Sequence, residues 1–147
     1  MDFYEGLSEL LLSQLSLKSA LVDGKKRPYI TFEPIQDNEK GIALLDAPST
    51  PNLRYLDRSK SYDWMVQVMV KNKNQHHAML DSHAIYELCD NLPKLVTETG
   101  EIITVSSKNK SFELIHSKGY TLPRMIDKTD TNAYIYSFLL KFELYIK

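Results

Sequence analysis

The alternation of hydrophobic and polar residues is strongest in the last part of the chain, over residues 132–147. Every second residue there carries a large apolar side chain: Tyr134, Tyr136, Phe138, Leu140, Phe142, Leu144 and Ile146. The residues between them include Ser137, Lys141 and Glu143. Successive side chains of a strand point to opposite faces of a sheet, so this period of two predicts one long strand with a continuous apolar face.

A second run with the same period lies over residues 62–71. Its apolar positions are Tyr62, Trp64, Val66, Val68 and Val70. The two runs are about 70 residues apart in the sequence, so we expect a sheet that is built from distant segments. The strand at the end of the chain is therefore predicted to be part of the core.

Helical spacing predicts two helices. Residues 2–22 place Leu7, Leu11 and Leu15 on one stripe, and residues 75–91 place Leu80, Ala84 and Leu88 on another, with Pro93 as a stop. A shorter strand is expected at 29–34, and residues 120–126 should be extended. Two more strands, 102–105 and 112–115, are expected to form a hairpin through loop 106–110.

Residues 36–61 read as a long irregular arm, because two turn-rich stretches enclose short apolar runs. The arm still carries Ile42, Leu44, Leu45, Leu53, Tyr55 and Leu56, which a solvated linker would not need. It would pack either on its own sheet or on a partner. The fold class predicted is α+β: a single domain over 1–147, a mostly antiparallel sheet with two helices packed on one face, and this arm.

Composition places the chain among ordinary soluble proteins. It has 147 residues, 43% hydrophobic and 25% charged, with a formal net charge of -1 that draws it to neither nucleic acid nor an anionic membrane. A single cysteine, Cys89, fits a reducing compartment, and no apolar stretch is long enough to span a membrane. We expect a soluble, cytoplasmic product with no membrane partner.

Candidate chemistry is sparse. His76, His77, Asp81 and His83 are close in sequence, but Ala84 and Ile85 stand where a third metal ligand would be needed, so a solvated helix face is expected. Cys89 is predicted to be a small buried or half-buried hydrophobe. The sequence has no nucleophile elbow, P-loop or glycine-rich phosphate motif. We therefore expect no enzyme, no catalytic or metal-binding residue and no cofactor.

Basic residues concentrate at the predicted turns: Lys25, Lys26, Arg27, Lys71, Lys73, Lys108, Lys110 and Lys118. If these turns gather at one end of the sheet, they would form a positive patch for a phosphate backbone. Surface lysines of any soluble protein would give the same pattern, so both interpretations stay open.

The order of several short sequence motifs can be compared with known families. These motifs are residues 42–48 (IALLDAP), 62–64 (YDW), 85–93 (IYELCDNLP), 112–115 (FELI), Pro123 with 126–127, and 134–138 (YIYSF). The layout resembles the minor capsid or tail terminator proteins, the head-tail joining group of long-tailed bacteriophages. The resemblance spans residues 1–147. It rests on element order and apolar phrases, with no catalytic signature.

The resemblance implies a structural virion protein that forms a homo-oligomeric ring, commonly a hexamer. The ring would end the tail tube by replacing its next ring, and would offer a docking surface to the head connector. The implied partners are other copies of the chain, the tail tube protein and the connector protein, at the head-tail junction of the virion.

Two sets of residues follow as candidates for this role. The arm would supply the subunit or partner interface with Ile42, Leu44, Leu45, Leu53, Arg54, Tyr55 and Leu56. The lumen, through which DNA passes transiently, would be lined by Lys25, Lys26, Arg27, Lys71, Lys73, Lys108 and Lys110.

Three other functions remain open at this point. The chain could be a head-completion protein that stays on the connector. It could be a small α+β enzyme or ligand-binding domain with a pocket between sheet and arm, which a bound ligand would reveal. It could also be an adaptor or inhibitor that binds one host protein as a monomer.

Overall fold

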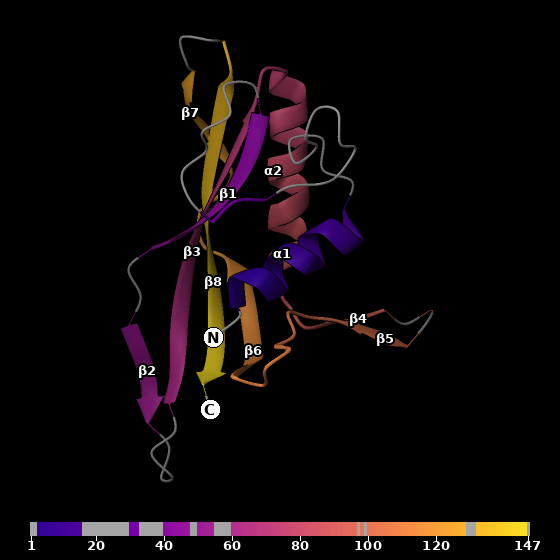
Figure 1. The fold of residues 1–147 in the computed structure, drawn as a ribbon, viewed down its shortest axis with the longest axis vertical. Coiled ribbons are helices and arrows are strands. Elements are labelled where there is room, and N and C mark those ends of the chain that lie inside the picture. The colour runs from indigo at the N-terminus through magenta and orange to yellow at the C-terminus, as the bar shows by residue number, and fades with distance from the viewer. Residues whose placement is uncertain are drawn as a thin grey trace.

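Two strands of 13 residues, β3 (Lys60–Asn72) and β8 (Tyr134–Ile146), form the centre of the sheet in the computed structural model of the protein (Figure 1). They are antiparallel along their whole length, with Val66 opposite Leu140. Both strands predicted from the alternation are thus confirmed. The structure describes residues 3–15, 30–32, 40–47, 50–54, 60–96, 98, 100–128 and 132–146.

Each central strand has two shorter neighbours on its outer edge. β1 (Lys40–Asp46) and β2 (Thr50–Arg54) pair with β3, while β6 (Phe112–Gly119) and β7 (Arg124–Lys128) pair with β8, all antiparallel. The expectation of an irregular arm over 36–61 is therefore wrong for its described residues at 40–46 and 50–54. Ile42 and Leu44 point into the core, and the backbone of β1 pairs with one edge of β3.

Two helices, α1 (Phe3–Gln14) and α2 (Gln75–Cys89), cover one face of the sheet (Figure 1). The Phe3 ring of α1 lies 5.0 Å from Phe142, and the Tyr86 ring of α2 lies 6.1 Å from Phe138. Phe138 and Phe142 are four residues apart on β8, so they share a face. The prediction of two helices on one face is confirmed.

The helix bounds agree with the sequence pattern where they are described. α2 begins after Asn74, whose side chain accepts a hydrogen bond from the His77 amide at 3.2 Å, as an N-cap does. α1 ends at Gln14, and residues 16–22 of the predicted helix lie outside the described part. The strand expected over 29–34 is described only at 30–32, where Thr31 makes an isolated parallel bridge to Ala43.

A β-bulge at Ile115 decides which side chains of β6 enter the core. Leu114 lies opposite Leu144, but His116 lies opposite Glu143, so one extra residue is inserted in β6. The bulge turns Ser117 toward the helices, opposite Phe142, and Ser117 is 1% exposed. Strict alternation along β6 would have placed it on the other face.

Two short strands, β4 (Lys94–Val96) and β5 (Glu101–Ile103), form a separate hairpin that projects from the lower right of Figure 1. Leu95 lies directly opposite Ile102. The hairpin predicted between 102–105 and 112–115 is therefore wrong. Gly100 has a φ of +72°, which suits the turn between β4 and β5, while β6 pairs with β8 instead.

Candidate functional site

The side chains first considered for chemistry do not assemble into a catalytic or metal site. His76 and His83 are exposed, whereas Asp81 is buried on another side of α2. Among the described residues, no three His, Cys, Asp or Glu side chains are grouped as metal ligands would be. Cys89 is buried, as predicted, and burial raises the pKa of its thiol to about 12. A thiol with that pKa is a poor nucleophile at neutral pH.

One polar cluster that sequence reasoning missed lies at the start of α1. The Tyr4 hydroxyl donates a hydrogen bond to the Asp46 carboxylate at the end of β1, and the Trp64 indole N–H donates to the Tyr4 oxygen at 3.1 Å. Burial, together with the bond to Asp46, raises the pKa of Tyr4 well above its ordinary value. A phenol held neutral in this way fastens α1 to β1 and β3, so the cluster has a structural role.

The residues predicted for an interface in the arm are divided by the structure. Ile42 and Leu44 are 0% and 1% exposed, so they contact the chain's own core and present no surface to a partner. Leu45 is half-buried on the helix-free face of the sheet, opposite Gln67. Leu53 and Arg54 belong to β2, whose side chains are not described, and Tyr55 and Leu56 lie outside the described residues.

The basic turn residues do not gather at one end of the sheet. Lys71 and Lys73 adjoin the end where β3 pairs with Tyr134, whereas Lys108 and Lys110 precede β6 at the end where Phe112 pairs with Ile146. At about 3.4 Å per residue, these two ends of β8 are roughly 40 Å apart. Lys71 is also buried, and Lys108 forms an ion pair with Glu9 at 2.7 Å. Residues 25–27 lie outside the described part.

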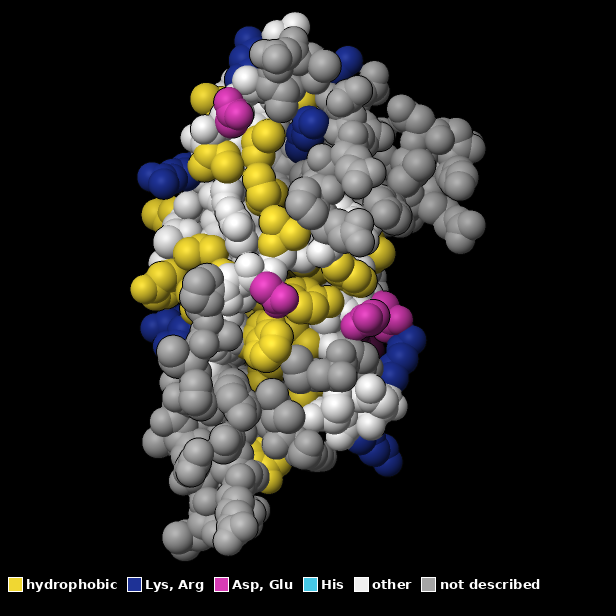
Figure 2. Space-filling view, turned by 60° about the vertical axis from the view of Figure 1, so that its left-hand side comes forward, with side chains coloured by type: hydrophobic (Ala, Val, Ile, Leu, Met, Phe, Trp, Pro, Cys, Tyr) yellow, Lys and Arg dark blue, Asp and Glu magenta, His cyan; other side chains and the backbone are white. Residues whose placement is uncertain are grey.

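The helix-free face of the sheet is of mixed character. Half-buried apolar side chains alternate with polar pairs, such as Gln67 with Ser137 at 3.1 Å and Lys141 with Asp63 at 2.9 Å. Figure 2 shows hydrophobic side chains in a band along this side of the molecule. Polar pairs that are already satisfied within the subunit make this face a weaker candidate for assembly than the two surfaces that follow.

The first of the stronger surfaces is the β4–β5 hairpin. Leu95 is 64% exposed and Ile102 is 66% exposed, and as directly opposed residues they point to the same side of the hairpin. The root of the hairpin is fixed, because the Lys94 ammonium donates to the Glu87 carbonyl at 2.6 Å and Ser117 bonds to Cys89 and Leu92. The structure thus holds an apolar pair away from the body of the molecule.

The second surface, which we name the edge segment, comprises residues 118–128 and includes β7. Its large exposed apolar side chains are Tyr120, Leu122, Met125 and Ile126, between 45% and 69% exposed. The amides of Tyr120 and Thr121 donate to the Leu139 carbonyl, at 2.9 and 3.2 Å, so the segment is attached to β8. Every residue of β7 is exposed. Exposed apolar groups that cluster in this way mark interaction surfaces.

Neither surface was found from the sequence, since an apolar residue in a short strand is ordinarily assigned to the core. The two glutamates close to the turn, Glu98 and Glu101, were the signal that could have separated this hairpin from a core strand. Among the described residues, no helix is long and apolar enough to cross a membrane.

Comparisons with known proteins give the family and a similar fold. Residues 14–146 match the family described as bacteriophage tail terminator protein. The fold is similar to a chain in the solved structure "Virion of native gene transfer agent (GTA) particle", with a TM-score of 0.52 and 11% identity over 94% of this chain and 91% of that one. Among curated proteins, no match is found. Since the family match extends over most of its length, the chain belongs to the bacteriophage tail terminator family.

Proposed function

We propose that this protein is a structural, non-enzymatic subunit of the virion that ends a phage tail tube. Copies of the chain form a closed ring, commonly of six subunits, which sits on the last ring of the tube and offers its other side to the head connector. The observation that carries the proposal is the family match over residues 14–146. Subunits would be made in the host cytoplasm and taken up at the head-tail junction.

The distribution of exposed apolar groups supports an assembly role. Among the described residues, the β4–β5 hairpin and the edge segment expose six large apolar side chains, although the interior holds a well-filled core. A ring needs two different complementary surfaces on each subunit, because every subunit contacts one neighbour on each side. The chain offers two such surfaces, on separate elements.

Contact with passing DNA is a narrower proposal. The two lysine groups lie at opposite ends of the sheet, so DNA in a lumen would meet Lys71 and Lys73 at a different depth from Lys108 and Lys110. Replacement of a group by Gln should reduce DNA retention if that end of the sheet faces the lumen. If neither replacement changes DNA retention, the DNA-facing role is wrong.

The test of the main proposal uses purified protein and tail tubes assembled from the tube protein. We expect rings of about six copies in negative-stain images, bound at one end of each tube, and an arrest of tube growth when the protein is added early. Tubes that continue to grow with the protein present would contradict the proposal. Binding to isolated connectors but never to tubes would assign the chain to head completion instead.

A further inference from the structure

We propose that the β4–β5 hairpin of one subunit docks on the edge segment of a neighbouring copy, so that the ring is closed by one repeated head-to-tail contact. This inference rests on the proposed function, since it names the interface of the proposed ring. The inference rests on two surfaces at opposite sides of the molecule. The hairpin combines exposed apolar and acidic side chains, and the strand edge combines exposed apolar and basic side chains.

The hairpin has the properties of a docking element. A two-stranded hairpin is at best marginally stable in water without a partner surface. In the described structure, β4 and β5 contact mainly each other, and Leu95 and Ile102 are more than half exposed on the same side. Docking would remove both side chains from water and support the hairpin at the same time.

The edge segment has the properties of a receptor for that hairpin. Among the described strands, β7 pairs only with β8, so its outer edge is available to another strand. Leu122, Met125 and Ile126 are exposed beside that edge. An incoming hairpin could therefore add backbone hydrogen bonds along β7 while its apolar pair covers these side chains.

The charges of the two surfaces are complementary. Exposed Glu98 and Glu101 lie at the turn and on β5 of the hairpin, and Lys94 is half-buried at its root. The edge segment carries three exposed basic residues against one acidic residue: Lys118, Arg124 and Lys128 against Asp127. Opposite charges favour the hairpin-to-edge contact, and like charges oppose hairpin-to-hairpin and edge-to-edge contacts. Such a pattern disfavours a two-fold dimer and favours a head-to-tail chain of subunits.

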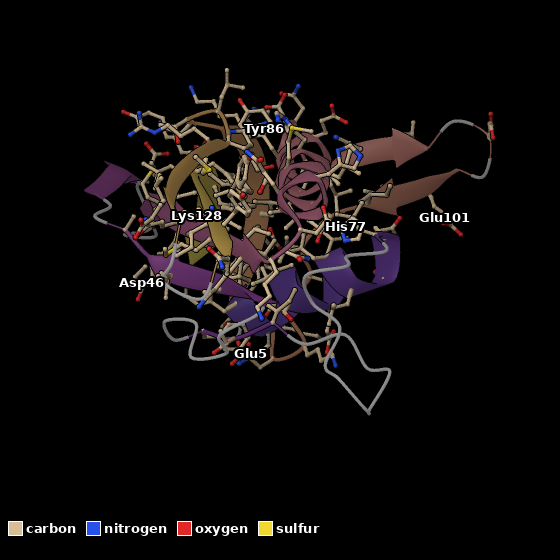
Figure 3. All side chains as sticks on the ribbon, turned by 90° about the horizontal axis from the view of Figure 1, so that it is seen from above. Glu5, Asp46, His77, Tyr86, Glu101 and Lys128 are labelled. Atoms are coloured by element: carbon tan, nitrogen blue, oxygen red, sulfur yellow. The ribbon has the colours of Figure 1, made fainter. Side chains whose placement is uncertain are left out.

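The positions of the two surfaces suit a repeated contact. Figure 1 shows the hairpin at the lower right of the molecule and β7 at the upper left. In Figure 3, viewed from above, Glu101 and Lys128 lie on opposite sides of α2, and Glu101 is far out on the projecting hairpin. A subunit can therefore engage one neighbour through its hairpin and another through its edge segment.

The test begins with sedimentation velocity of the full chain over a wide concentration range. We expect Glu98→Lys with Glu101→Lys to weaken self-association by roughly tenfold or more, and Arg124→Glu with Lys128→Glu to do the same. All four changes in one chain should restore association, because the charges are then exchanged across the contact. Glu5→Lys on α1 is the matched control, and it should associate like the wild type.

A mixing experiment separates head-to-tail contact from other geometries. The hairpin variant Leu95→Asp, Ile102→Asp keeps an intact edge segment, and the edge variant Leu122→Asp, Met125→Asp keeps an intact hairpin. Each alone should remain monomeric with an unchanged circular dichroism spectrum. Their mixture should give heterodimers but no rings, because each pair has a single productive contact.

The outcomes distinguish this inference from the proposed function. Rings formed by the hairpin variant would overturn the inference about the hairpin, while the proposed ring-forming function would still hold. A hairpin variant that forms rings but no longer binds tail tubes would assign the hairpin to the tube protein and overturn the inference. A wild-type chain that stays monomeric at every concentration and on tail tubes would contradict both proposals.

Discussion

Replacement of Ser117 by alanine tests how the helical layer is joined to the sheet. The Ser117 hydroxyl donates to the Cys89 carbonyl at 2.6 Å and accepts from the Leu92 amide at 3.0 Å. All three residues are buried, so no water can replace the hydroxyl. The substitution would leave one backbone acceptor and one backbone donor without these bonds, at the point where α2 ends and the hairpin begins.

The cost follows from the two backbone groups that lose a partner. Each such buried group costs about 1–3 kcal/mol, so we expect Ser117→Ala to lower the free energy of unfolding by about 2–6 kcal/mol. For a chain of this length, about 2–4 °C of melting temperature is lost per kcal/mol, which gives a decrease of roughly 4–24 °C.

The assay is equilibrium unfolding in urea followed by circular dichroism, with Ser106→Ala as the control. Ser106 is an exposed serine in the loop before β6, so its substitution should change the free energy of unfolding by less than about 0.5 kcal/mol. The slope against urea should be the same for all three proteins. If Ser117→Ala were as stable as Ser106→Ala, the bridging role assigned to the Ser117 hydroxyl would be wrong.

Three further predictions address the core, a close approach and a buried thiol. Phe3→Ala removes a fully buried ring that contacts Phe142, and should cost about 3–5 kcal/mol in urea unfolding; a loss below 1 kcal/mol would mean that α1 is not anchored by this ring. A Cβ on Gly119 would overlap the Tyr86 ring, so Gly119→Ala should cost about 1–3 kcal/mol, and most of that cost should disappear in a Tyr86→Leu background, whereas additive effects would argue against the overlap. Cys89 has a raised pKa in the folded chain, so its contribution to stability is present below pH 9 and is lost as the pH rises toward about 12. Over that window the free energy of unfolding should fall by up to about 1.4 kcal/mol per pH unit more steeply for the wild type than for Cys89→Ala, and parallel curves would contradict the burial of the thiol.

The long elements could be predicted from the sequence because their period is uninterrupted. β8 and β3 are strands of 13 residues each, and the alternation covers most of both. The helical spacing of Leu80, Ala84 and Leu88 found α2 between Asn74 and Pro93 but not its packed face. Leu80 is 49% exposed, and Ala78, Ile85 and Cys89 contact the core instead. β1 has the same alternation at Ile42 and Leu44, but the turn residues on both sides of it favoured an arm. Its pairing with β3 is a tertiary contact that no local signal encodes.

The two surfaces proposed for assembly were beyond sequence reasoning for a related reason. Leu95 and Ile102 are apolar, and periodicity assigns apolar residues to a core unless the fold is known. Ser117 was missed because the bulge at Ile115 reverses which side chains of β6 face the core, and no residue type marks that insertion. The turn lysines Lys71, Lys73, Lys108 and Lys110 could not be assigned to two ends of the sheet until the register of β3 and β6 on β8 was known.

The pairing of β3 with β8 also constrains when the subunit can fold. The two strands meet across about 70 residues of intervening chain, which gives the fold a high contact order and a slow search for the native pairing. During synthesis, β3 would leave the ribosome well before β8 is available, so its inner edge would stay unpaired through that interval. The surfaces proposed for assembly would therefore take their final positions only after β8 has been synthesised, and a nascent chain would not offer them to finished copies before then.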